Sequence, residues 1–189
     1  MPARVLRCRP VEWAAACTDV GSLAELLAAG EQQTLEFFVG RLAAVSEPTV
    51  DHQELLYNAS VLAHFATTST MSPDVFPASP TGLTAVLDLF VLDRSQHADP
   101  QIMEAAASQC LVLTGFFQDQ LRRRHNLHWF AALGADFYDQ AAHLGTDRHR
   151  AKMMGTMASR FQFWREQQHR LAHELRDLPF LIKGPNQVM

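Results

Sequence analysis

A glutamate and an asparagine one helical turn apart are the first residues that could do chemistry. Glu54 and Asn58 fall on one line of a helical projection with Val61 and Phe65, inside an apolar arc. A buried amide without a partner costs about 1–3 kcal/mol, and a lone charge costs more. Both side chains therefore need partners, which come either from a hydrogen-bond network within the protein or from a ligand.

Two more polar residues of the same segment extend this candidate ligand site. Tyr57 and His64 share a second polar side of the helix with Ser60. The alternative for His64 is a histidine that is exposed or bonded within the protein. Glu54, Tyr57, Asn58 and His64 are the residues that we expect to contact a ligand if the protein binds one.

A glutamate and two histidines near the end of the chain have the spacing of metal ligands. Glu166 and His169 match the Glu-x-x-His spacing of di-iron bundles, and His169 and His173 point the same way on a helix. The projection places all three opposite Trp164 and Leu171, so we expect them to face water, whereas bundle metal sites point inward. No second Glu-x-x-His occurs in the sequence. We therefore predict no metal site and no cofactor.

Two charged groups are further candidates. Asp139 and His143 lie one turn apart and could share a proton or a cation, but they project opposite Phe130 and Phe137, which indicates a solvated face.

Three consecutive arginines, Arg122, Arg123 and Arg124, could bind an anion or an acidic partner. Their alternative role is a helix end at which positive charge is favourable. The sequence has no glycine-rich phosphate loop, paired-cysteine motif, serine elbow or HExxH motif, so it predicts no catalytic residue.

The element that must position these residues is a helix predicted over 99–124. Asp99 can cap it, and Pro100 fits its first position. Residues 105–117 are apolar or small at nearly every position, so other helices must cover this one on all sides. Gly115 in its interior predicts that another helix crosses close to the backbone.

The flanking elements are also predicted to be helical. Helices are expected over 22–45, 52–67, 81–93, 126–144 and 147–178, with Asp51 and Asn126 as N-caps and Gly145-Thr146 as a short joint between two antiparallel helices. Residues 67–82 are rich in Pro, Ser and Thr and are predicted to be a loop, either a lid, a binding segment or disordered. Residues 179–189 are predicted to be a tail.

These elements predict an all-α protein, with residues 1–189 as a single domain. We expect an irregular or orthogonal bundle of about six helices around the buried central helix. The chain is 48% hydrophobic and 19% charged, which is typical of globular proteins, and no apolar run reaches the about 20 residues of a membrane span. A net charge of −4 does not favour nucleic-acid binding. Three cysteines without a metal-type spacing indicate a reducing compartment, and we expect a cytoplasmic protein.

One stretch carries a resemblance. The sequence CLVLTGFF from Cys110 to Phe117, followed by Leu121 with its arginines and by the aromatics from Trp129 to Tyr138, resembles uncharacterised bacterial all-helical proteins. The resemblance implies no activity and no functional residue.

These observations favour a cytoplasmic binding or regulatory protein that offers a helical surface to a protein partner or to a second copy as a homodimer. The alternative is an enzyme or small-molecule-binding protein with a pocket between the 52–67 helix and the central helix, near Glu54 and Asn58. A deep pocket converging on these two residues would favour the alternative, and an exposed apolar patch would favour a protein partner.

Overall fold

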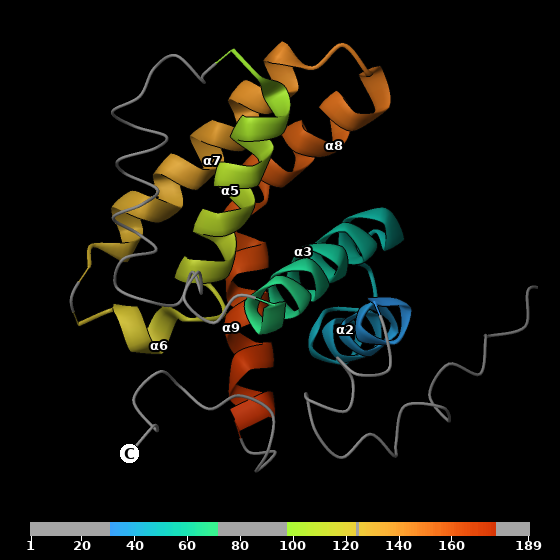
Figure 1. Ribbon diagram of the computed structural model, residues 1–189, viewed down its shortest axis with the longest axis vertical. Helices are drawn as coiled ribbons and strands as arrows, with labels where there is room; N and C mark the ends of the chain where they lie inside the picture. Colours follow the sequence, from blue (N-terminus) through green and yellow to red (C-terminus); the bar gives the residue numbers. More distant parts are fainter. Residues whose placement is uncertain (1–30, 72–97, 124, 177–189) are drawn as a thin grey trace, which may run out of the picture.

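The computed structural model describes residues 31–71, 98–123 and 125–176, and every regular element within these ranges is a helix. The helices are α2 (Glu31–Val45), α3 (His52–Met71), α5 (Pro100–Thr114), α6 (Gln118–Leu121), α7 (Leu127–Leu144), α8 (Arg148–Ser159) and α9 (Phe161–Arg176). They pack against one another as a bundle (Figure 1). The all-α prediction is therefore confirmed for this part of the chain. None of the described helices combines the length and the apolar character that a membrane span requires.

The predicted central position of the helix that begins at Pro100 is confirmed. α5 packs against α7, α9, α6 and α3, and lies among them in Figure 1. The residues of α5 that are buried are Met103, Ala106, Ala107, Ser108, Cys110, Leu111, Val112, Leu113 and Thr114. The predicted capping is also confirmed, because the Asp99 carboxylate accepts a hydrogen bond from the Gln101 N–H (2.8 Å).

The predicted length of this helix is wrong. α5 ends at Thr114, and Gly115 caps it before α6 begins at Gln118. A Cβ atom at Gly115 would lie 3.0 Å from the Arg165 carbonyl oxygen, so α9 crosses close to the backbone here, as the glycine predicted. The crossing falls at the end of the helix, where the chain turns, and not in its middle.

The last predicted helix is also divided. α8 and α9 meet at Arg160, which has the non-helical backbone angles φ −108° and ψ 17°. The N-cap of α8 is Asp147, because its carboxylate accepts a hydrogen bond from the His149 N–H at 2.8 Å. The short joint at Gly145 does produce an antiparallel pair of helices.

The pairing of α7 with α8 follows from small residues whose contacts run in reverse order along the chain. A Cβ atom at Gly145 would lie 3.6 Å from Ala151 Cβ, and one at Gly155 would lie 3.9 Å from Ala142 Cβ.

Several predicted boundaries can be compared directly with the described residues. α2 ends at Val45, ahead of Pro48, as expected, and α3 continues to Met71, so the loop predicted over 67–82 does not begin at 67. Residues 72–82, the predicted 81–93 helix, the first part of the predicted 22–45 helix and the 179–189 tail lie outside the described residues. The single-domain organisation stays a prediction.

Candidate functional site

The predicted burial of Glu54 and Asn58 is confirmed. Glu54 is 5% exposed and Asn58 is fully buried. Asp51 fixes the first turn of α3, because its carboxylate accepts hydrogen bonds from the Gln53 N–H at 2.8 Å and the Glu54 N–H at 3.3 Å. This leaves the Glu54 side chain free to turn inward, toward α8 and α9.

The carboxylate of Glu54 is paired within the chain. Arg160 donates to Oε1 at 2.8 Å, and the indole N–H of Trp164 donates to Oε2 at 2.9 Å. The Arg160 guanidinium also lies over the Phe163 ring, 4.4 Å from its centroid, which adds a cation–π contact. Glu54 therefore holds the junction of α8 and α9 against α3.

Asn58 extends the same buried network by one turn. Its amide N–H groups donate to the Glu54 carbonyl oxygen at 2.9 Å and to Met157 Sδ at 3.4 Å, while Gln168 donates to its Oδ1 at 3.5 Å. Of the two explanations that the sequence left open for Glu54 and Asn58, the geometry favours an internal network.

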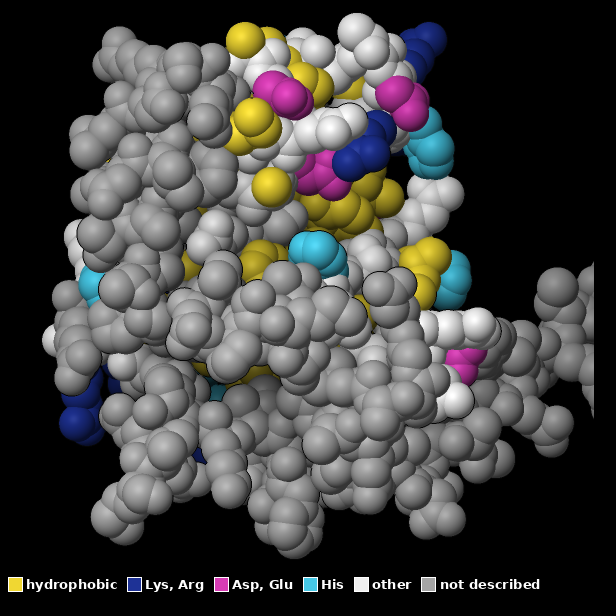
Figure 2. Space-filling model, viewed as in Figure 1, with side chains coloured by type: hydrophobic (Ala, Val, Ile, Leu, Met, Phe, Trp, Pro, Cys, Tyr) yellow, Lys and Arg dark blue, Asp and Glu magenta, His cyan; other side chains and the backbone are white. Residues whose placement is uncertain are grey.

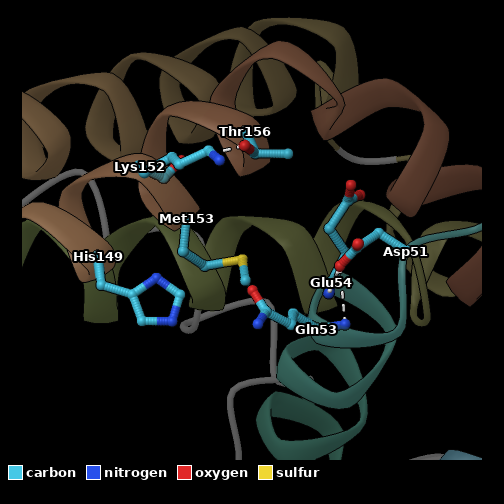
Figure 3. Close-up of a pocket in the computed structure, with 7 residues that line it drawn as sticks. All are labelled: Asp51, Gln53, Glu54, His149, Lys152, Met153 and Thr156. Atoms are coloured by element: carbon cyan, nitrogen blue, oxygen red, sulfur yellow. Dashed lines mark hydrogen bonds between the residues drawn. The ribbon is translucent and has the colours of Figure 1, made fainter.

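A pocket of about 240 Å³ lies beside this network, between the start of α3 and α8. In Figure 3 the side chains from α8 lie on one side and those from α3 on the other. Glu54 is among the lining residues, but its two carboxylate oxygens already accept hydrogen bonds from Arg160 and Trp164. The pocket is lined by Asp51, Gln53, Glu54, His149, Lys152, Met153 and Thr156.

Tyr57 belongs to a second polar cluster, on the other side of α3. Its hydroxyl donates to Glu104 Oε1 at 3.1 Å and lies 3.3 Å from Ser108 Oγ and 3.4 Å from the Tyr138 hydroxyl. Burial, followed by the neighbouring Tyr138 and Glu104, raises the pKa of Tyr57 well above its usual value. Burial raises the pKa of Tyr138 in the same way. Both phenols are therefore neutral hydrogen-bonding groups at physiological pH.

A charged pair completes this cluster at the surface. Arg150 of α8 donates through Nε to Glu104 Oε2 at 2.8 Å, and its Nη2 lies 2.8 Å from the same oxygen as an ion pair. Hydrogen bonding to Glu104 and its negative charge raise the pKa of Arg150. Since the Arg150 side chain is 58% exposed, the pair faces solvent on one side and Tyr57 on the other.

The Tyr57 groove is our name for two hollows that share Tyr57, Ser60, Glu104 and Arg150 in their linings. The smaller hollow, of about 270 Å³, is lined by residues of α3 and α5, including His64, and by Arg150 of α8. The larger hollow, of about 670 Å³, lies on the side toward α8. Figure 2 shows a hollow in this region, with apolar side chains at its floor and acidic and basic side chains beside one another above it. The apolar lining residues of the larger hollow are Leu35, Leu56, Met153 and Met154.

The four residues predicted to contact a ligand are therefore divided between two sites. Tyr57 and His64 line the Tyr57 groove, whereas Glu54 and Asn58 lie in the buried network behind it. Glu104 and Arg150 line the groove, and the sequence analysis did not identify them. The available signal for Glu104 was that it is the one charged residue of α5, a helix that is mostly apolar or small.

A third cluster includes two of the residues considered for metal binding. His173 and Glu166 are exposed, as predicted, but His169 is only 27% exposed because it packs beside Asp119 of α6. Glu166 does not join the histidines, since it accepts a hydrogen bond from Gln162 at 3.0 Å. The expected solvated face is therefore wrong for His169.

Asp119 is the residue around which this cluster gathers. Arg176 donates to its Oδ2 at 2.9 Å, and Arg122 approaches its Oδ1 at 3.5 Å. Burial alone would raise the pKa of Asp119. Hydrogen bonds from Arg176 and His169 and the charges of His169 and His173 lower this pKa, and together they outweigh burial, so the pKa lies below its usual value.

The three arginines do not converge on one described site. Arg122 pairs with Asp119, Arg123 is exposed, and Arg124 lies outside the described residues. The Asp139–His143 pair lies on a solvated face, as predicted, with 3.4 Å between Asp139 Oδ2 and His143 Nδ1.

Comparison of the whole chain with protein-family models, curated proteins and solved structures finds no match. The resemblance of residues 110–138 to bacterial helical proteins therefore stays a prediction. The chemistry available at the sites described above is the basis for assigning a function.

Proposed function

We propose that this protein is a cytoplasmic binding or regulatory protein that accepts an amphipathic helix of a protein partner in the Tyr57 groove. The observation that carries this proposal is the larger hollow, about 670 Å³ in volume, with the 42% exposed Leu56 in its wall. Exposed apolar surface within a groove is typical of a protein-binding site.

The shape and composition of the groove support a helical ligand. Two helices, α3 and α8, supply most of its lining, and a helix from a partner can lay its apolar face between them. Methionine side chains are flexible and polarizable, so the partly exposed Met153 can adapt to the partner. The Glu104–Arg150 pair at the rim can orient a partner that carries both signs of charge.

The polar groups of the groove favour binding over catalysis. Tyr57 has a raised pKa, and Glu104 already accepts hydrogen bonds from both Tyr57 and Arg150. Because its pKa is raised, the Tyr57 phenol stays protonated at physiological pH and meets a ligand as a hydrogen-bonding group and not as a base.

A small-molecule ligand is the second candidate. It is favoured by the smaller hollow, where Tyr57, Ser60, Glu104 and Ser108 bring polar atoms to one end of a space of about 270 Å³. This hollow lies between α3 and α5, the two helices between which the sequence analysis expected a pocket, but Glu54 and Asn58, which were expected near that pocket, do not line it.

Photo-crosslinking tests the proposal with a matched control. Leu56 and Leu144 are exposed to similar extents, 42% and 40%, but only Leu56 lines the groove. With p-benzoylphenylalanine at Leu56, we expect one discrete partner adduct that is absent when the probe is at Leu144. A Leu56→Glu variant should lose the partner, and a Leu144→Glu variant should keep it.

The outcomes separate the candidates. An adduct of twice the chain mass identifies a homodimer through the same groove, whereas a small mass retained in native mass spectrometry identifies a bound small molecule. Equal crosslinking from Leu56 and Leu144 would show that the groove is not the binding surface.

A further inference from the structure

Two helices bring three metal-binding side chains together on a face that shares no lining residue with the Tyr57 groove. His169 and His173 come from α9, one turn apart, and Asp119 comes from α6. The two Nε2 atoms lie 3.1 Å apart. Asp119 lies 3.4 Å from His169 through Oδ1 and 3.1 Å from His173 through Oδ2.

These distances match the spacing of ligands around a metal ion. Tetrahedral coordination with bonds of about 2.0–2.1 Å places neighbouring ligand atoms about 3.3–3.4 Å apart. One ligand atom from each of Asp119, His169 and His173 can be chosen so that all three lie within 4.8 Å of one another. The two imidazole nitrogens lie 3.1 Å apart, and each lies 3.1–3.4 Å from one carboxylate oxygen.

The orientation of the two imidazoles also points to a cation. Both rings direct Nε2 toward the same place, where Asp119 also directs its oxygens. If both rings carry a proton on Nε2, each can donate to its own Asp119 oxygen, but the two protons then face each other across the 3.1 Å between the nitrogens. A divalent ion accepts a lone pair from each of the three side chains at once.

The two arginines that contact Asp119 are compatible with such a site. Arg176 holds Oδ2 at 2.9 Å and Arg122 approaches Oδ1 at 3.5 Å. Their side chains are 57% and 61% exposed, so either can move away from the oxygen that binds the ion. The other oxygen stays hydrogen-bonded, as the carboxylate ligands of metal sites commonly are.

We infer that Asp119, His169 and His173 form a binding site for a divalent transition metal of the zinc type. Two imidazoles and one carboxylate are ligands that Zn²⁺ accepts, and the His173 side chain is 51% exposed, so the fourth position is open to water. The ion would link α6 to α9.

Zinc titration of the full-length chain tests the site with a matched control. His143 lies 3.4 Å from a carboxylate one turn away and is exposed, but no second histidine is beside it in the described structure. We expect one equivalent of Zn²⁺ to bind to the unmodified chain and to His143→Gln with the same affinity. His169→Gln and His173→Gln should each weaken binding about tenfold or more, because even the loss of an outer-shell partner costs about 10–100-fold.

Cobalt provides a readout that does not depend on the variants folding. Co²⁺ added to the unmodified chain should give the visible absorption bands of a site with nitrogen and oxygen ligands, and stoichiometric Zn²⁺ should remove them. The inference is overturned if the unmodified chain binds no Zn²⁺. It is also overturned if His169→Gln and His173→Gln, folded by circular dichroism, bind Zn²⁺ as tightly as His143→Gln.

Discussion

Two glycines in neighbouring helices should respond to the same substitution with opposite signs. Gly134 lies within α7, and Gly155 lies within α8. In an unobstructed helix, replacing glycine with alanine stabilises the folded state by about 0.5–1 kcal/mol, because the alanine backbone loses less conformational freedom. The surroundings of the added methyl group decide whether this gain is realised.

At Gly134 the methyl group has no room. Its Cβ would lie 2.6 Å from Phe161 Cζ and 2.7 Å from Cys110 Cβ, both buried. The phenyl ring can tilt, but Cys110 Cβ is fixed to the backbone of α5, so α5 and α7 must separate. Overpacking of this kind costs about 1–3 kcal/mol, and the gain in helix propensity offsets only part of it. We expect Gly134→Ala to lower the free energy of unfolding by about 1–2 kcal/mol.

At Gly155 the nearest atom to the added methyl group is Ala142 Cβ at 3.9 Å, which is an ordinary contact. Gly155→Ala should therefore raise the free energy of unfolding by about 0.5–1 kcal/mol. Urea unfolding followed by circular dichroism measures both variants, with a shift in midpoint at unchanged slope as the criterion. If Gly134→Ala stabilises the protein as Gly155→Ala does, the close packing of α7 on α5 described here is wrong.

Three other changes test the buried and clustered groups. Glu54→Ala should lower the free energy of unfolding by about 2–3 kcal/mol in urea melts, because it leaves Trp164 and Arg160 without their acceptor. Glu54→Gln should lower it less, because an amide oxygen remains. Equal losses of stability in the two variants would contradict the pairing. Burial raises the pKa of Cys110 to about 12, so iodoacetamide at about pH 8 should modify this thiol only after unfolding, as peptide mass mapping would show. The pKa of Asp119 is lowered in the folded state, so the ionised carboxylate stabilises the fold above about pH 4, and this stabilisation is lost at lower pH. Between about pH 5 and pH 3, Asp119→Asn should therefore lose less stability in urea melts than the unmodified chain.

The parts of the fold that could be predicted from the sequence depend on local signals. The side chains of Asp51, Asp99 and Asn126 cap their helices as expected, because a cap requires only a short polar side chain ahead of a helical segment. The burial of Glu54 and Asn58 followed from their place in an apolar arc. Such signals are contained within a few residues of the chain.

The helix breaks could not be predicted because they depend on tertiary contacts. Gly115 signalled a close approach, but a glycine is compatible with both a helix interior and a helix end, and the Arg165 carbonyl on α9 is what it approaches. Nothing in the residues around Arg160 ends a helix, yet the chain turns there and the Arg160 side chain pairs with Glu54, far away in sequence.

Only some of the residues of each site could be predicted from the sequence. The spacing of His169 and His173 identified two candidate ligands, but their carboxylate is Asp119 on α6 and not the neighbouring Glu166. Spacing along one helix reveals which side chains share a face of that helix. It does not reveal which residue of another helix packs against that face.

The buried network and the Tyr57 groove are connected through α3. Glu54 binds Arg160 at the end of α8, and Asn58 contacts Met157 in the same helix, so these inward-facing residues hold α8 against α3. Tyr57 and Leu56, which face the groove, lie on the same turns. Because the groove's larger hollow lies between α3 and α8, the contacts made by Glu54 and Asn58 determine its width. Glu54 and Asn58 would therefore affect the proposed binding indirectly, by fixing the distance between the two walls that a partner helix would contact.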